Sequence, residues 1–250
     1  DPDTALIRDL EDRLARLRKH TNGVILICFD YDPGTAPELR PMAEAILHHA
    51  FRKDIAVLGN VGANVNSAQL AQDTITTVAR RETDDFDRPV TGVDYVFLGY
   101  RPSPLILYMQ MGESVIQAYE SDYAGRDLNT LPMMEGVRDF NDIEMVVELT
   151  GYVGMPEIWL NVAKTKYNRT VGLGMTAVSA ADYYPYIQSG QIAGLLSGLR
   201  GAAEYETAID YPSRAVQRMR PQLYAHVLAL ALLLLGNGES LVARLRKPRR

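Results

Sequence analysis

The apolar and polar positions of this chain follow two different periods in turn. The unbroken apolar run at residues 24–29 predicts a strand that is buried on both faces. Similar runs predict strands at residues 55–61, 93–102, 143–152 and 170–179. Between them, apolar residues recur three and four positions apart, as they do on one face of a helix. These segments predict helices at residues 36–54, 67–82, 155–168 and 190–209.

Strand and helix therefore alternate at least four times, which is typical of right-handed crossovers between parallel strands. The pattern predicts an α/β fold with a doubly wound, mostly parallel sheet of five strands or more. We assign this domain to residues 21–212. Leucines three and four residues apart predict an N-terminal amphipathic helix over residues 1–20. Residues 213–250 are expected to form a C-terminal apolar, membrane-associated helix with a basic tail.

Three segments do not follow the alternation clearly. Residues 104–120 have no period that separates helix from strand, and the polar residues 121–142 indicate an excursion over the surface. Within the predicted helix at 190–209, Gly194 and Gly198 are four residues apart. That spacing suggests close packing of the helix against the sheet or another subunit.

Composition and charge narrow the possible functions. A chain of 250 residues with 47% apolar content can bury one large core. The formal charge of −5 argues against a nucleic-acid partner, because phosphate contacts need clustered Lys and Arg on the folded surface. The single cysteine, Cys28, lies in an apolar run and is expected to be a small core residue. It excludes an intrachain disulfide and a cysteine-based metal site.

In open α/β sheets, ligands bind beyond the carboxyl ends of the strands. The predicted strands end in a polar rim that almost any doubly wound domain would supply. Its members are Asp30, Tyr31, Asp32, Asn60, Asn64, Asn66, Tyr100, Arg101, Thr150, Tyr152, Thr176, Ser179 and Asp182.

The most specific motif in this rim is FDYDPGT, at residues 29–35. A strand followed by Asp-x-Asp and Gly-Thr resembles the first motif of the haloacid-dehalogenase-type phosphohydrolases. The resemblance implies a nucleophile at Asp30, a general acid at Asp32 and a bound Mg²⁺, with Thr176 as the phosphate-binding hydroxyl. Pro33 is an extra residue in that motif, and the later metal-binding acids are missing. The alternative is that both acids end the strand and cap the following turn and helix.

A second candidate surface is rich in tyrosine. Tyr183, Tyr184 and Tyr186 surround Pro185 and are expected on a loop beside the strand ends, where aromatic rings favour contact with a partner or ligand. Covering the edge of the core is an equally open alternative. The whole candidate ligand or partner surface is Tyr100, Arg101, Ser179, Tyr183, Tyr184 and Tyr186.

The histidines do not predict a metal site. His48 and His49 are adjacent, so they point to different sides of their predicted helix and cannot chelate one ion.

The runs FDYDP (29–33) and DYVFLGYRP (94–102), together with residues 176–206, resemble a family of uncharacterised bacterial and archaeal membrane-anchored proteins. In that family an α/β domain is held between apolar segments. The resemblance covers roughly residues 24–240 and implies membrane association, without implying any activity or catalytic residue. An N-terminal apolar segment is not found here, so we expect that it was removed or not included.

The C-terminal apolar run supports the same location. Residues 223–235 are apolar except for His226, but this is 13 residues where a membrane span needs about 20. A core helix buried on every side is the alternative. The basic residues after the run favour a cytoplasmic tail and a domain on the opposite side of the cell membrane. Arg214, Arg218 and Arg220, before the run, count against that orientation.

Two functional classes remain open from the sequence. We favour a non-catalytic, membrane-anchored domain without a cofactor, whose partners are membrane lipid and either a second copy or another protein. The alternative is a membrane-tethered, Mg²⁺-dependent phosphohydrolase-like enzyme that uses Asp30 and Asp32.

Overall fold

The computed structural model describes residues 23–86 and 89–245, with six parallel strands in one sheet. The strands are β1 Val24–Asp30, β2 Ala56–Val61, β3 Tyr95–Tyr100, β4 Ile143–Thr150, β5 Thr170–Met175 and β6 Gly194–Ser197. Their order across the sheet is β3-β2-β1-β4-β5-β6. The predicted doubly wound α/β fold is therefore confirmed, and its strand order is Rossmann-like. The predicted helix at residues 1–20 lies outside the described residues.

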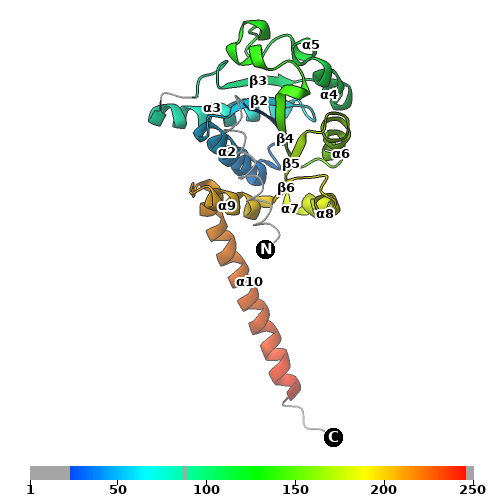
Figure 1. The fold of residues 1–250 in the computed structure, drawn as a ribbon. Coiled ribbons are helices and arrows are strands. Elements are labelled where there is room, and N and C mark those ends of the chain that lie inside the picture. The colour runs from blue at the N-terminus through cyan, green and yellow to red at the C-terminus, as the bar shows by residue number, and fades with distance from the viewer. Residues whose placement is uncertain (1–22, 87–88, 246–250) are drawn as a thin grey trace.

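Helices cover both faces of the sheet (Figure 1). The main helices are α2 Ala36–Arg52, α3 Asn66–Phe86, α4 Pro104–Glu113, α5 Val115–Tyr119, α6 Met155–Trp159, α7 Ala177–Ala180, α8 Tyr184–Gln188, α9 Gly198–Ala208 and α10 Arg214–Leu245. A π-helix, Leu160–Lys166, continues α6. Four short 3₁₀ turns complete the described helices, at Leu128–Thr130, Pro132–Gly136, Phe140–Asp142 and Ala181–Tyr183.

The central strand β1 divides the core into two parts. Leu26 and Cys28 point into the cluster beneath α4 and α6, whereas Ile25, Ile27 and Phe29 point into the cluster beneath α2, α3 and α9. Alternate residues of a strand face opposite sides, so an unbroken apolar run is needed where both sides are covered. The buried Cys28 is a core residue, as predicted.

The segment at residues 121–142 packs more deeply than its polar composition suggested. It includes Leu128, Leu131 and Phe140, which are buried in the cluster beneath α4 and α6. With Met134 and Val137, they form a series of buried residues three positions apart, and the three short 3₁₀ turns in this segment bring residues at that spacing to one side. The excursion therefore covers one end of that cluster.

The predicted helix over residues 190–209 is wrong in its first half. Residues Gly194–Ser197 form β6, which pairs in parallel with β5, and α9 starts only at Gly198. A strand of four residues is too short to show a period of two, so only its pairing partner reveals it. The prediction of two glycines on one helix face is therefore also wrong.

Gly198 has a different role at the junction of β6 and α9. Its φ is 58°, in the left-handed region that glycine adopts without steric cost. A Cβ there would lie 2.8 Å from the Cβ of Ala177 and 2.9 Å from Glu38 Oε2. The junction therefore needs both the backbone freedom and the small size of glycine.

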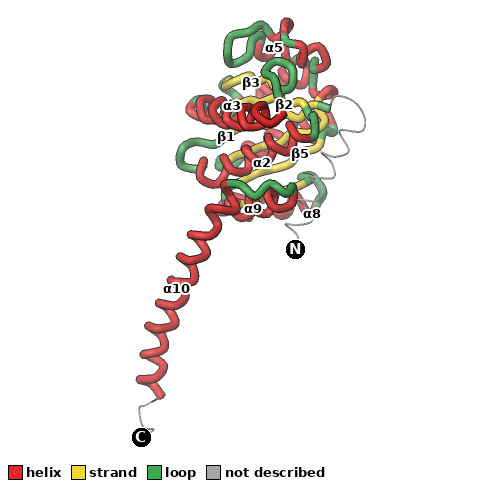
Figure 2. Tube along the Cα trace, turned by 90° about the vertical axis from the view of Figure 1, so that its left-hand side faces the viewer, coloured by secondary structure: helices red, strands yellow, loops and turns green. Residues whose placement is uncertain are grey.

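The last helix, α10, leaves the domain and extends away from it (Figures 1 and 2). Its first turn is fixed by Glu206, whose carboxylate accepts hydrogen bonds from the backbone N–H groups of Ser213, Ala215 and Val216. Farther along, apolar side chains are exposed, from 57% for Leu230 to 72% for Tyr224. Among the described residues, Arg214–Asn237 is the one stretch long and apolar enough to cross a membrane.

We predict that Gly198→Ala lowers the free energy of unfolding by about 2 kcal/mol or more, through backbone strain and crowding together. Gly190→Ala is the matched control, because Gly190 also has a positive φ, of 72°, but a Cβ there would meet no atom within 4 Å. It should cost only about 1 kcal/mol. Urea unfolding measures both values, and equal losses would contradict the crowding at Gly198.

Candidate functional site

The carboxyl ends of β1 and β4 meet where the strand order reverses, the usual ligand crevice of such sheets. Here the crevice is bridged by side chains. The Tyr152 hydroxyl donates to Asp32 Oδ2 over 2.9 Å, and Asn64 Nδ2 donates to the Tyr152 hydroxyl over 3.1 Å. Gly151 lies so close to Thr35 that a Cβ at residue 151 would be 2.5 Å from the Thr35 methyl carbon. The two loops are therefore packed together.

Asp32 stabilises the turn that leads into α2. Its Oδ1 accepts hydrogen bonds from the N–H groups of Gly34 and Thr35, at 2.9 and 3.0 Å. The Thr35 N–H and the Tyr152 hydroxyl lower the pKa of this carboxyl group, so it is ionised at neutral pH. Asp32 therefore holds the turn, as in the alternative interpretation, but it is not the N-cap of α2, which is Thr35. A general acid would need the opposite, a raised pKa.

Asp30 also ends a strand, but its carboxylate reaches sideways to the loop after β2. Oδ1 accepts hydrogen bonds from the N–H groups of Gly62 and Ala63, at 2.8 and 2.9 Å. The residue is wholly buried. Asp30 thus ties β1 to the β2 loop, whereas capping of its own following helix was expected.

Beside Asp30 lies a second buried acid, Glu148, in the middle of β4. Cys28 pairs with Glu148 in the sheet register, and Asp30 is two residues farther on, so both acids are on the α4 side of the sheet. Glu148 Oε2 accepts a hydrogen bond of 2.7 Å from Trp159 Nε1. The other oxygens, Asp30 Oδ2 and Glu148 Oε1, find no donor among the described residues.

One proton held between the two carboxyl groups would give these two oxygens a hydrogen bond. Burial, followed by the charge of Asp30, raises the pKa of Glu148 well above its usual value. Burial also raises the pKa of Asp30, to about 6, although its two backbone hydrogen bonds oppose the shift. Two buried carboxylates this close do not both ionise, so Glu148 keeps a proton and donates it toward Asp30.

Aromatic side chains close the space around this acid pair. The rings of Tyr108 and Trp159 are stacked with centroids 3.8 Å apart, and both residues are buried. Asn60 Nδ2 donates to the Tyr119 hydroxyl at 3.4 Å, beside the same cluster. The pair is therefore a sealed polar part of the core.

Sequence reasoning missed Glu148, although a signal was present. It stands in the run MVVELT, within the strand predicted at residues 143–152 of a mostly parallel sheet. An acid inside such a strand must be buried and needs a partner. The pattern gave no means of identifying that partner as Asp30, which is 118 residues earlier in the chain.

The other predicted site residues are spread over the sheet. Thr176 is bonded to Ser179 through their hydroxyl groups at 3.1 Å, next to β5. Two strand spacings, about 10 Å, separate β5 from β1, so Thr176 does not lie beside Asp30. Tyr100 ends β3, an edge strand on the other side of β1, and Arg101 follows it and donates to the Tyr119 carbonyl. The predicted partner surface is therefore not continuous.

The tyrosine segment consists of short helices, where a loop was expected. Tyr183 is buried, and its hydroxyl donates to the carboxylate of Glu157. Tyr186 is partly buried against it, with ring centroids 5.7 Å apart. Tyr184 remains 38% exposed. Two of the three rings thus cover the edge of the core, which is the structural alternative.

The two adjacent histidines bind different partners at the other end of α2. His48 stacks on Tyr211 and lies 2.6 Å from Glu82, whereas His49 lies 2.7 Å from the Tyr205 hydroxyl. Burial lowers the pKa of His49 to about 4, so it is neutral. No group of three acidic, histidine or cysteine residues suited to a metal ion occurs within residues 23–86 and 89–245.

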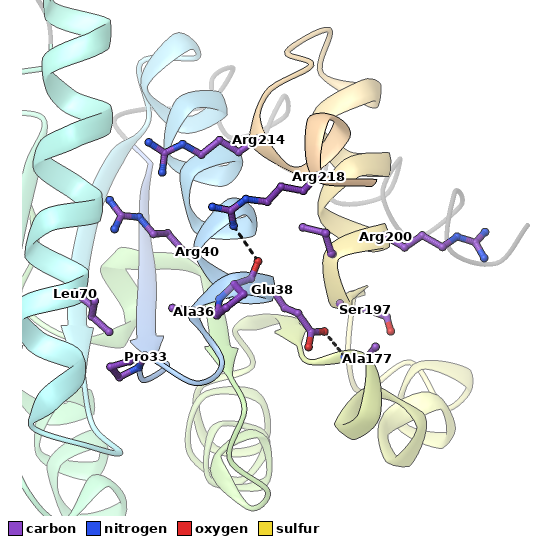
Figure 3. Close-up of a pocket in the computed structure, with 13 residues that line it drawn as sticks. Pro33, Ala36, Glu38, Arg40, Leu70, Ala177, Ser197, Arg200, Arg214 and Arg218 are labelled. Atoms are coloured by element: carbon purple, nitrogen blue, oxygen red, sulfur yellow. Dashed lines mark hydrogen bonds between the residues drawn. The ribbon is translucent and has the colours of Figure 1, made fainter. Parts of the chain in front are cut away.

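An open pocket of about 780 Å³ lies where α2, α9 and α10 meet (Figure 3). Arg40, Arg214 and Arg218 line one side of it, and Glu38 lies opposite with its carboxylate accepting a 2.9 Å hydrogen bond from the Ala177 N–H. Arg200 is at the rim and points away. The sequence pattern did not indicate this pocket, because its arginines come from three helices and Arg40 of α2 is far in sequence from those of α9 and α10.

Comparison of the chain with protein-family models, curated proteins and solved structures gave no match. The resemblance to membrane-anchored α/β proteins therefore stays a prediction. A Rossmann-like sheet occurs in proteins of many functions, so the fold alone assigns none here.

The acid pair makes a specific prediction about pH. Because both folded pKa values are raised, the stabilisation from the shared proton is complete below about pH 4 and is lost as the pH rises through the folded values. Glu148→Gln keeps an acceptor for Trp159 and a permanent donor for Asp30. We expect it to be more stable than the wild type at about pH 8, by about 1 kcal/mol or more.

Unfolding by urea across this pH range measures the effect. Glu144→Gln is the control, since Glu144 is on the same strand but exposed. It should leave the pH profile unchanged. Parallel profiles for the wild type and Glu148→Gln would contradict the shared proton.

Proposed function

We propose that this chain is a membrane-anchored, non-catalytic binding domain that docks a protein partner or a second copy of itself. The observation that carries the proposal is the exposure of α10. Its residues Val227, Leu228 and Leu230 are each at least 57% exposed, and Leu232–Leu235 are 61–70% exposed. Such a continuous apolar surface is unfavourable in water, at about 25 cal/mol for each Å² exposed. A lipid bilayer would cover it on every side.

The length of the helix supports this role. The apolar run at 223–235 is short for a span, but helical backbone continues through Leu245. The 22 residues 224–245 rise about 33 Å, close to the hydrocarbon thickness of a bilayer, about 30 Å. Tyr224, at the start of the exposed stretch, is a residue type that favours the membrane interface.

The orientation that we propose follows from the basic residues. Arg244, Arg246, Lys247, Arg249 and Arg250 follow the apolar run. By the positive-inside rule they favour a cytoplasmic tail, with a single pass and the α/β domain outside the cytoplasm. Of the arginines before the span, Arg214 is paired with the buried Glu44, which reduces its weight, whereas Arg218 and Arg220 still count against this orientation.

Exposed apolar side chains on the α/β domain offer a docking surface. Val65, Val153 and Val178 follow the carboxyl ends of β2, β4 and β5, and are 61%, 71% and 87% exposed. On α4, which follows β3, Leu105 and Ile106 are 49% and 60% exposed. These residues support the docking of a protein at this edge better than Gly198 or Tyr183, which are buried.

The geometry favours binding over phosphoryl transfer. A nucleophilic Asp30 would have to meet its substrate, yet its side chain is wholly buried with one oxygen on two N–H groups. Asp32, the expected acid, has a lowered pKa. Hydrolysis of p-nitrophenyl phosphate with added Mg²⁺, lost in Asp30→Asn but retained in Glu144→Gln, would overturn the non-catalytic proposal.

Arginine in the middle of α10 tests the membrane anchor. We expect Leu230→Arg combined with Leu233→Arg to oppose insertion by about 5 kcal/mol, because each charge enters the hydrocarbon. In a liposome flotation assay the wild type should float and the double variant should remain at the bottom. Val178→Arg, at an 87% exposed position outside α10, should float like the wild type. A wild-type chain that does not float would contradict the proposal.

A further inference from the structure

We propose that the pocket between α2, α9 and α10 binds the phosphate of an anionic lipid headgroup, from the leaflet that α10 enters. This inference rests on the proposed membrane anchor. It adds a ligand and a site, which the anchor alone does not require.

Two of the arginines that line the pocket belong to a network of ion pairs. Glu44 is buried and contacts Arg40 at 3.1 Å, Arg214 at 2.9 Å and Arg81 at 3.5 Å. Arg40 also contacts Asp73, at 2.7 Å. Arg81 does not line the pocket, and the two arginines of this network that do, Arg40 and Arg214, are matched by the two carboxylates.

Arg218 supplies a positive charge that this network does not neutralise. It is exposed, and its Nη1 donates to the backbone carbonyl of Pro37 over 3.3 Å. Figure 3 shows its side chain reaching from α10 toward the first turn of α2. No carboxylate pairs with Arg218 among the residues that the structure describes. Glu38, on the opposite side, is the one acid that lines the pocket, and it is already held by Ala177.

The backbone around the pocket also favours an anion. Ala36 and Gly198 are the first residues of α2 and α9, and both line the pocket. Neither helix has a side-chain cap on its N-cap residue. The positive ends of two long helix dipoles therefore add to the field of the arginines.

The position of the pocket along α10 points to a lipid as the source of the anion. Arg218 is six residues before Tyr224, where the exposed stretch begins, so it lies about 9 Å along the helix axis from that point. The headgroup layer on each side of a bilayer is about 5–8 Å thick. Arg218 therefore lies at the surface of the headgroup layer, about 1–4 Å beyond it, when α10 spans the bilayer.

The first turn of α10 is held by hydrogen bonds and an ion pair, so the position of the pocket relative to the membrane helix is fixed. Glu206 binds three N–H groups at the start of the helix, and Arg214 binds Glu44 of α2. The pocket and the membrane helix are therefore parts of one packed unit. The volume of about 780 Å³ is within the usual range of ligand pockets, about 300–1,000 Å³.

Lipid binding to the full chain in dodecyl maltoside micelles tests the proposal by native mass spectrometry. Phosphatidylglycerol should bind more tightly than phosphatidylcholine, whose trimethylammonium group would face the arginines. We expect Arg218→Gln to weaken phosphatidylglycerol binding about ten-fold or more, since it loses a charge-assisted hydrogen bond. Arg218→Glu should abolish the preference. Arg138→Gln is the control, because Arg138 is 81% exposed in the loop before β4.

Several outcomes would overturn the proposal. Equal binding of the two lipids, or equal losses in Arg218→Gln and Arg138→Gln, would reject the headgroup site. Displacement of the lipid by inorganic phosphate at the same concentration would mean that the pocket takes a free anion. Unchanged melting temperatures in lipid-free micelles would show that both variants are folded. If the chain floats with liposomes but shows no lipid preference, only this inference fails, and the membrane anchor stands.

Discussion

Both faces of a parallel sheet must be covered, and this constraint organises the whole chain. The strands are joined by crossovers, so each connection crosses a face and brings a helix to it. The segment from α2 to α9 supplies these covers, including the 121–142 excursion beneath which Phe140 is buried. Once α9 has packed, no sheet face needs α10. Its apolar side chains consequently remain exposed, and the described part of the domain contains no surface that hides them.

The same sheet brings two acids together in its interior. Asp30 and Glu148 lie on neighbouring strands at the point where the strand order reverses, which other folds of this type leave open for a ligand. Here Tyr152 bridges the loops, and Trp159 and Tyr108 cover the acids. A shared proton makes such a pair tolerable in the core, because an unpaired buried carboxylate costs several kcal/mol.

A second group of charges connects the domain to α10. Glu44 is a buried acid with three arginine partners, one of which, Arg214, belongs to the first turn of α10. Removing Glu44 would leave these arginines without their common partner, so Glu44 affects the charge of the pocket and, together with Glu206, the direction of α10. The Glu44–Arg214 contact therefore connects the membrane helix to the basic pocket. In our proposals the helix anchors the chain and the pocket binds a lipid headgroup.

The sequence by itself determined the fold class. A strand buried on both faces needs a continuous apolar run, and an amphipathic helix needs apolar residues three or four positions apart. It also determined that Cys28 is buried and that residues 227–235 are apolar on every side of a helix. It did not determine β6, since four residues carry no readable period and only pairing with β5 defines them. It showed that Glu148 is an acid in an apolar strand, but it did not identify the partner of Glu148. Tertiary structure decided that Asp30 faces Glu148, that Asp32 holds a turn, and that arginines from α2 and α10 line one pocket. Contacts between residues more than 100 positions apart depend on strand order and helix placement, which no local pattern encodes.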